Sequence, residues 1–201
     1  EMETGLPDMQ EAKNEITSIA LHDSATNQYY VLVLDKEGGL SNKKTDKAIV
    51  LPFRSEAELL EKYLELYEYI NPSIVTGWNI DYFDTPYLYN RIKNLLGKRQ
   101  ANRLSPIGEC FWSPYRKRFF MAGVSYLDYL ALYKNFTYTE LDNYRLDSIA
   151  NKELGRGKVE YSGNLDQLFR DDIEKFIEYN LVDVELVVDM DTKLQFIDTA
   201  R

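Results

Sequence analysis

The sequence predicts an α/β protein, because segments with the pattern of strands are followed by segments with helical spacing. Two β-rich runs at 16–22 and 29–34 are joined by a turn-rich connection and predict an antiparallel hairpin, continued from a first strand at the N-terminus. Residues 55–69 then have the pattern of an amphipathic helix, and a short β-branched run follows at 74–79. These segments predict a strand–helix–strand unit.

The helix at 55–69 is predicted to begin after Ser55, because serine is a favoured N-cap residue and acidic residues follow in the first turn. The strand at 74–79 leads into a second helix, with Pro86 expected at its first position and an end near Gly97. Asp84 lies between this strand and this helix, where α/β folds often place functional residues. This window by itself favours helix capping and catalysis equally for Asp84.

The region after the second predicted helix differs in composition from the segments before it. Residues 104–123 combine prolines, glycines, aromatic and basic side chains, and they predict an irregular loop or a protruding hairpin. Trp112 in this region is expected either to pack or to press on nucleic-acid bases. Downstream, the sequence predicts a strand at 124–130, helices at 133–136 and 144–154, a loop at 155–158 and a long helix at 171–199.

Two polar residues stand out on the long final helix. Tyr179 and Asp183 are four residues apart and therefore lie on successive turns of one face. Asp183 is expected at the edge of the apolar stripe, beside Phe176 and Val187. Because a carboxylate at the edge of a core requires a partner, we expect either a cation from the fold or a bound metal ion beside it.

Composition limits the classes of function. The formal net charge of −9 over 201 residues does not favour a protein that binds nucleic acid by overall electrostatic attraction. Residues 91–118 are locally basic and could guide a phosphate backbone, although a solvated helix and loop is the favoured explanation. The single cysteine, Cys110, excludes an internal disulfide and is expected to be an inert thiol. With no apolar run long enough to span a membrane and no signal peptide, these features predict a cytoplasmic protein without a membrane partner.

The first residues of the chain carry two acids at alternating positions. In a strand, Glu1 and Glu3 point to the same face. Like charges side by side cost free energy unless a cation lies between them. The alternative is a frayed acidic terminus.

Three separated motifs now occur in order: E-x-E at the start, G-W-N-x-x-x-F-D ending at Asp84, and Y-x-x-x-D ending at Asp183. In this order they resemble the three exonuclease motifs of family B DNA polymerases, and most of all those of T-even-type bacteriophages. Phrases such as TGWNIDYFDTPYLYNRIKNLLG, VSYLDYLALYKNF and IEYNLVDVELV extend the resemblance along the whole chain. The resemblance implies a proofreading 3′–5′ exonuclease with an RNase H-like α/β fold, in which helices flank a mixed central sheet. It also implies that residues 1–201 form a single domain, a fragment of a larger DNA polymerase.

The same resemblance implies a set of site residues. The catalytic residues would be Glu3, Asp84, Tyr179, Asp183 and Lys158. Hydrolysis of a phosphodiester by two divalent ions requires carboxylates that converge from distant parts of the chain. The expected cofactors are therefore two divalent cations, Mg²⁺ or Mn²⁺, and the expected partners are the 3′ end of single-stranded DNA and the remainder of the polymerase. The tyrosine would orient the attacking water and the lysine would neutralise a phosphate oxygen.

Glu1 departs from the family pattern, which has aspartate at this position. We include Glu1 as the fourth metal ligand, although its longer side chain reaches differently from that of aspartate. The departure also suggests an alternative function, in which the chain is a weakened or inactive module that binds single-stranded DNA or supports a polymerase. Metal-dependent loss of nucleotides from a labelled 3′ end distinguishes the two functions.

Overall fold

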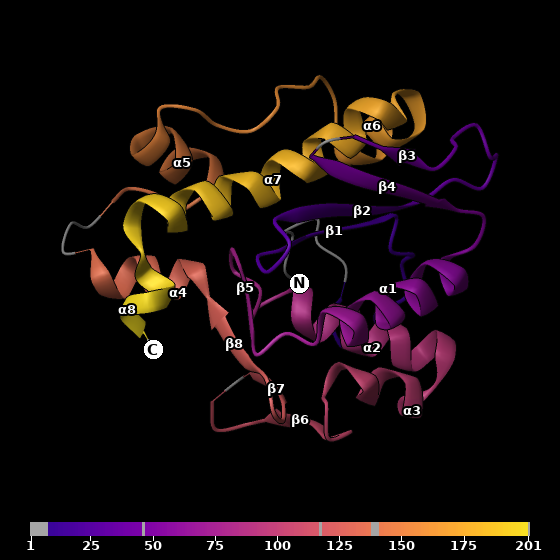
Figure 1. The fold of residues 1–201 in the computed structure, drawn as a ribbon, viewed down its shortest axis with the longest axis horizontal. Coiled ribbons are helices and arrows are strands. Elements are labelled where there is room, and N and C mark those ends of the chain that lie inside the picture. Colours follow the sequence, from indigo (N-terminus) through magenta and orange to yellow (C-terminus); the bar gives the residue numbers. More distant parts are fainter. Residues whose placement is uncertain (1–7, 46, 117, 138–140, 201) are drawn as a thin grey trace. The chain divides into compact units, whose positions relative to one another are not determined.

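The computed structural model describes residues 8–45, 47–116, 118–137 and 141–200 of the chain, and Figure 1 labels their helices and strands. The strands are β1 (Ser18–Asp23), β2 (Gln28–Leu34), β3 (Lys43–Lys44), β4 (Ala48–Phe53), β5 (Ile74–Gly77), β6 (Cys110–Ser113), β7 (Arg118–Met121) and β8 (Ser125–Asp128). The helices are α1 (Glu56–Ile70), α2 (Asp84–Leu96), α3 (Lys98–Ala101), α4 (Tyr129–Phe136), α5 (Leu146–Leu154), α6 (Leu165–Asp171), α7 (Ile173–Leu194) and α8 (Phe196–Ala200). A 3₁₀ turn, Asn102–Leu104, follows α3. None of the described helices has the length and apolar composition needed to cross a membrane.

The chain forms two compact units. One contains the described residues before Ser18 together with Ser55–Asp128, and the other contains Ser18–Arg54 together with the described residues from Tyr129 onward. We call them the first and second units. The expected first strand at the N-terminus falls in residues 1–7, outside the described residues.

The second unit is built on a four-stranded sheet in the order β1-β2-β4-β3. The predicted hairpin is confirmed, since β1 and β2 pair antiparallel with Ser18 opposite Val33. β2 and β4 pair parallel, whereas β3 and β4 pair antiparallel, so the sheet is mixed as expected. The core of this unit lies where α6 and α7 bring Leu168, Phe176 and Ile177 against valines of β2 and β4.

The long predicted helix at 171–199 is wrong at both ends. α7 begins at Ile173, because the Asp172 side chain accepts a hydrogen bond from the Lys175 backbone N–H at 3.0 Å and caps the helix. It ends at Leu194, because Gln195 adopts a left-handed conformation with φ of 54° and starts a separate helix, α8. α7 packs on β1 and β2 of the sheet (Figure 1).

The first unit joins α1 and α2 to the parallel pair β5 and β8 and to the hairpin β6–β7. The Ser55 hydroxyl accepts a hydrogen bond from the Glu58 N–H at 3.3 Å, which confirms the predicted N-cap of α1. Gly97 ends α2 as predicted, with φ of 92°. The predicted start of this helix is wrong, because α2 begins at Asp84 and Pro86 is its third residue.

Candidate active site

Three of the predicted site residues lie together in the second unit. Tyr179 and Asp183 lie one turn apart on α7, and Lys158 lies on the loop after α5. The Lys158 Nζ donates to Asp183 Oδ2 at 2.7 Å and to the Tyr179 hydroxyl at 3.0 Å. The structure thus joins a lysine, a phenol and a carboxylate in one hydrogen-bonded group.

The loop that carries Lys158 is held by α5. The backbone N–H of Lys158 donates to Asp147 Oδ1 at 2.7 Å. A Cβ atom on Gly157 would lie 2.3 Å from the same oxygen, so the Asp147 carboxylate would have to move to admit a side chain there. Glycine at this position therefore favours the hydrogen bond between Asp147 and the Lys158 backbone.

Burial controls the electrostatics of this group. Burial raises the pKa of Asp183 above its usual range, although the ion pair with Lys158 acts in the opposite direction. For Lys158, burial lowers the pKa, but Asp183 and the Tyr179 hydroxyl together raise it above its ordinary value. Lys158 is therefore positively charged at neutral pH and partly compensates the half-buried carboxylate.

The two oxygens of Asp183 differ. Oδ2 is paired with Lys158, whereas Oδ1 is buried and has no hydrogen-bond partner among the described residues. A buried carboxylate oxygen without a donor is costly unless a cation satisfies it. Of the two partners expected from the sequence, the cation from the fold is present at Oδ2, and Oδ1 has the chemistry that a hard divalent ion prefers. Oδ1 is thus suited to serve as one ligand of a metal ion.

Asp84 lies in the first unit, at the first position of α2, and its side chain is exposed. The N-cap position is occupied by Phe83 and not by Asp84. The Phe83 side chain makes no capping hydrogen bond. A carboxylate in the first turn still interacts favourably with the helix dipole. The Phe83 ring stacks on Tyr87 with centroids 5.2 Å apart, which is packing within the helix.

A carboxylate that is not among the predicted site residues holds the loop before Asp84. Asp128, at the end of β8, accepts the backbone N–H of Asn79 at 3.0 Å and that of Asp81 at 3.2 Å. Asn79 has a φ of 61°, so the chain turns sharply directly after β5. The available signal was an acid inside the predicted strand at 124–130, which in the structure ends at Asp128. Parallel strands place polar groups at a common edge where they end.

The remaining predicted ligands, Glu1 and Glu3, lie outside the described residues. Of the four predicted ligands, Asp84 is described in the first unit and Asp183 in the second. Within the described ranges, no three His, Cys, Asp or Glu side chains are gathered in a way that could hold a metal ion.

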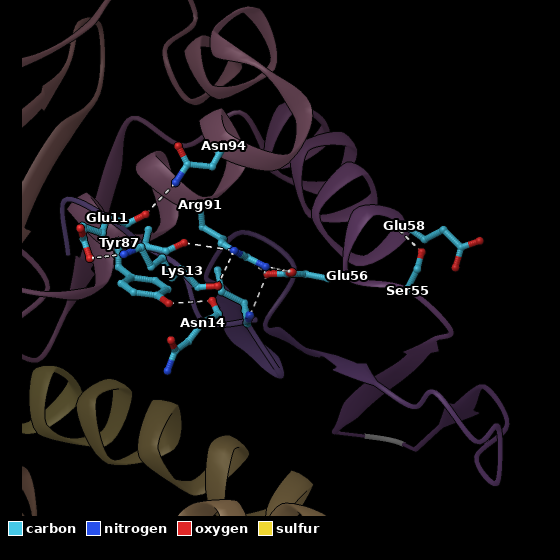
Figure 2. A network of polar contacts seen from close by, with 11 residues as sticks. Glu11, Lys13, Asn14, Ser55, Glu56, Glu58, Tyr87, Arg91 and Asn94 are labelled. Carbon is cyan, nitrogen blue, oxygen red and sulfur yellow. Dashed lines mark hydrogen bonds and ion pairs between the residues drawn. The ribbon is translucent and has the colours of Figure 1, made fainter. Parts of the chain in front are cut away.

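The locally basic region at 91–118 is partly neutralised by acids of the same unit. Arg91 pairs with Glu56 at 2.6 Å, as Figure 2 shows, and Arg118 pairs with Asp81 at 3.2 Å. Arg103 forms a two-pronged pair with Glu68. The excess positive charge of this region is therefore smaller than the residue count indicates.

The structure also describes Trp112 and Cys110, for which the sequence predicted packing or base contact and an inert thiol. Trp112 is 44% exposed in the β6–β7 hairpin and contacts the Phe119 ring with centroids 5.9 Å apart. Its side chain therefore packs on one face and reaches solvent on the other.

Burial raises the pKa of the Cys110 thiol to about 11, so this residue is a weak nucleophile at neutral pH, as expected.

Comparison with known proteins agrees with the resemblance to family B DNA polymerases. The sequence model of the family described as "DNA polymerase family B, exonuclease domain" matches residues 1–149. DNA-directed DNA polymerases of Escherichia phage RB69 and Enterobacteria phage T4 are each 36% identical over 96% of this chain, which corresponds to 24% of their own length. DNA polymerase 1 of Saccharolobus solfataricus is 30% identical over 93% of this chain and 20% of its own length. The chain thus spans about a quarter of the length of the two phage relatives.

Proposed function

Since the chain belongs to the exonuclease domain family of family B DNA polymerases, we propose that it removes nucleotides from the 3′ end of single-stranded DNA. In this proposal it is the proofreading part of a larger DNA-directed DNA polymerase, because its phage relatives bear that name and are about four times as long. The observation that carries the proposal is the match of the family model over residues 1–149. The Lys158–Tyr179–Asp183 group supports it with chemistry suited to a phosphodiester.

The proposed cofactors are two divalent cations, Mg²⁺ or Mn²⁺, held by Glu1, Glu3, Asp84 and Asp183. The family implies metal dependence, and the buried Oδ1 of Asp183 without a hydrogen-bond donor among the described residues supports it. When bound, such ions stabilise the negative charge on the attacking and leaving oxygens of the phosphodiester. Carboxylates are suitable ligands because hard divalent ions prefer oxygen donors.

Two side chains would act directly on the reactants. The Tyr179 hydroxyl lies one helical turn before Asp183 and could orient a water molecule for attack on the terminal phosphate. Lys158 supplies a positive charge that could compensate the developing charge on a phosphate oxygen. Because Lys158 donates to both Tyr179 and Asp183, its position also fixes the directions of the phenol and the carboxylate.

The proposed organisation is that both compact units together form one exonuclease domain over residues 1–201, a fragment of the polymerase chain. The two proposed partners are the unpaired 3′ end and the remainder of the polymerase. A domain that grips only a few unpaired nucleotides does not need a strongly basic surface, which agrees with the net charge of −9. We also propose action in the cytoplasm of a host cell, because relatives include phage polymerases.

A second candidate function rests on Glu1, which replaces the aspartate of the first motif. In this alternative, the domain holds single-stranded DNA or supports the polymerase without hydrolysis. It predicts that DNA binding persists in EDTA, while added Mg²⁺ or Mn²⁺ causes no loss of nucleotides.

The deciding experiment is digestion of a 3′-labelled single-stranded oligonucleotide in Mg²⁺, in Mn²⁺ and in EDTA. We expect metal-dependent release of single nucleotides from the 3′ end. Asp84→Asn and Asp183→Asn should each lower the rate at least about a hundredfold, because even residues that only support metal ligands typically cost ten- to a hundredfold. The matched control is Asp189→Asn, which alters an acid on the same helix as Asp183 that pairs with Arg156 instead.

The two functions give different results in this experiment. If wild type releases no nucleotides in either metal but retains DNA in EDTA, the binding module replaces the nuclease. If Asp84→Asn and Asp183→Asn retain the activity of Asp189→Asn, the proposed site is wrong although the nuclease is real.

A further inference from the structure

Lys158 is held by two helices of the second unit. Its Nζ donates to Asp183 and Tyr179 on α7. Its backbone N–H donates to Oδ1 of Asp147, an acid in the first turn of α5. α5 and α7 pack on each other, as Figure 1 shows. The side chain of Lys158 is thus attached to one helix and its main chain to the other.

The loop before Lys158 returns to the start of α5. It begins at Gly155, whose N–H donates to Asn151 O at 3.0 Å and whose φ of 70° ends the helix. It ends at Lys158, whose N–H bond to Asp147 measures 2.7 Å. Because Asp147 and Asn151 are four residues apart, they lie on one face of α5. This face therefore holds both ends of the loop.

The helix that carries Asp147 is itself fixed by its apolar face. Leu146, Ile149 and Ala150 are buried, whereas the loop at 155–158 contains neither helix nor strand. Asp147 is therefore a rigid point of attachment for an otherwise irregular segment.

Attachment of the backbone has a consequence for the ammonium group. A lysine side chain has several rotatable bonds, so directing Nζ to one place costs conformational entropy. This cost is lower when the backbone is already held, because fewer conformations remain to be lost. The bond to Asp147 therefore favours the arrangement in which Nζ of Lys158 reaches Asp183 and Tyr179.

We propose that Asp147 is a positioning residue of the exonuclease, and that it acts on the reaction through the backbone of Lys158. This inference rests on the proposed function, because it assumes that the Lys158 ammonium group compensates charge on a phosphate oxygen. The part of Asp147 that matters is the Oδ1 acceptor, which asparagine retains and alanine lacks. A role limited to the dipole of α5 would depend on the negative charge instead, which both substitutions remove.

The first test measures single-turnover release of nucleotides from the 3′-labelled oligonucleotide in Mg²⁺. Asp147→Ala should lower the rate about ten- to a hundredfold, because displacement of a catalytic group by about 1 Å can cost a hundredfold. Asp147→Asn should keep a rate close to that of wild type, since its amide oxygen accepts the Lys158 N–H. The matched control is Asp166→Ala. Asp166 is also the second residue of its helix and an acid of the first turn, but its side chain is exposed on α6.

A double substitution separates positioning from a general loss of stability. If Asp147 acts through Lys158, Asp147→Ala should cost no further rate in a chain that already carries Lys158→Met. If Asp147 acts independently, the two reductions in rate should multiply.

Gly157→Ala keeps the test available if Asp147→Ala does not fold. A Cβ atom on Gly157 would lie 2.3 Å from Asp147 Oδ1, so it displaces the acceptor while Asp147 stays in the chain. The matched control is Gly39→Ala, because a Cβ atom on Gly39 meets nothing within 4 Å and neither glycine has a positive φ. Gly157→Ala should lower the rate as Asp147→Ala does, and Gly39→Ala should leave it unchanged.

Lysine reactivity provides a readout that needs no nuclease activity. Reductive methylation of the 201-residue chain, followed by mass spectrometry of its peptides, measures how accessible each amino group is. The rate at Lys158 is divided by the rate at Lys44, an exposed lysine of the same unit. In Asp147→Ala this ratio should rise about two- to tenfold, the factor that corresponds to the loss of one hydrogen bond. In Asp166→Ala it should equal that of wild type.

The outcomes separate the inference from the proposed function. If Lys158→Met is slower than wild type while Asp147→Ala and Gly157→Ala match their controls, the inference alone is overturned. Reductions in rate that multiply in the double variant, or unchanged methylation of Lys158, overturn it as well. If wild type releases no nucleotides, the proposed function fails and a catalytic role of Asp147 fails with it. Slower digestion and faster methylation confined to Asp147→Ala and Gly157→Ala support the inference.

Discussion

The Lys158 ammonium lies 2.7 Å from Oδ2 of Asp183, although the two residues are 25 positions apart in the sequence. This pair gives the half-buried carboxylate a permanent cation on one oxygen and leaves the buried Oδ1 without a donor among the described residues. The lysine therefore has two opposing effects on a bound metal ion. It aligns the carboxylate, and its positive charge repels the ion.

Replacement of Lys158 by methionine separates these effects. We expect Lys158→Met to bind Mn²⁺ at least as tightly as wild type, because a competing positive charge is removed from Asp183. The turnover rate of the oligonucleotide should nevertheless fall about a hundredfold, if the lysine stabilises charge on the phosphate. Mn²⁺ titration and single-turnover digestion measure the two quantities. Lys175→Met, on the helix that carries Asp183, is the control. A turnover rate equal to that of this control would remove Lys158 from the proposed catalytic residues.

Tyr179→Phe removes only the hydroxyl that accepts a hydrogen bond from Lys158 at 3.0 Å. The Lys158–Asp183 pair and the ring packing against Tyr161 remain, so we expect a loss of about 1 kcal/mol in the free energy of unfolding or less. We expect kcat to fall about ten- to a hundredfold with an unchanged KM for the oligonucleotide, since the phenol would act on water and not on DNA. Equal digestion rates for the variant and wild type would show that the hydroxyl does not orient water.

The sequence predicted best those features whose causes are local. Ser55 and the acids after it define the start of α1 because the capping bond joins residues only three apart. β4 was missed, since Pro52 within AIVLPF is unfavourable in an interior strand. The structure tolerates this proline because β3 pairs only with Ile49 and Val50, so the side of Pro52 that faces β3 needs no N–H.

Local sequence patterns do not predict contacts between residues that lie far apart in the chain. The family resemblance placed both Lys158 and Asp183 in the site, but their pairing was not predicted, because no spacing rule connects a loop residue to a helix residue 25 positions later. The break at Gln195 was missed because a non-glycine residue in the left-handed region leaves no mark on hydrophobic periodicity. By contrast, α6 was detectable, because Asn164 and Gln167 form a capping box that the sequence displays as N-x-x-Q.

Asp128 provides a stability prediction at the loop before Asp84. Asp128→Ala leaves the N–H groups of Asn79 and Asp81 without their acceptor, so we expect the free energy of unfolding to fall by about 2–3 kcal/mol. Asp128→Asn keeps one carbonyl acceptor and should lose about half as much. Urea denaturation measures both values. Equal stabilities of Asp128→Ala and wild type would contradict a structural role of this carboxylate.

Asp35 provides a prediction of pH dependence in the second unit. Burial acts to raise the pKa of Asp35, but hydrogen bonds from the backbone N–H groups of Leu40, Gly38 and Gly39 together lower it by more. The pKa of Asp35 therefore lies below its ordinary value. The hydrogen bonds from Gly38 and Leu40 measure 2.9 and 2.8 Å. A carboxyl with a depressed folded-state pKa contributes stability that is present above the unfolded value of about 3.9 and is lost as the pH falls through the folded value.

Asp35→Asn should therefore be less stable than wild type at pH 7 and should lose less stability than wild type between pH 7 and pH 3, because the variant has no carboxylate to protonate. Thermal unfolding across this range measures the difference. The exposed Asp171→Asn is the control, and it should follow the pH profile of wild type. A parallel pH profile of wild type and Asp35→Asn would show that the Asp35 carboxylate is not stabilised in its charged form.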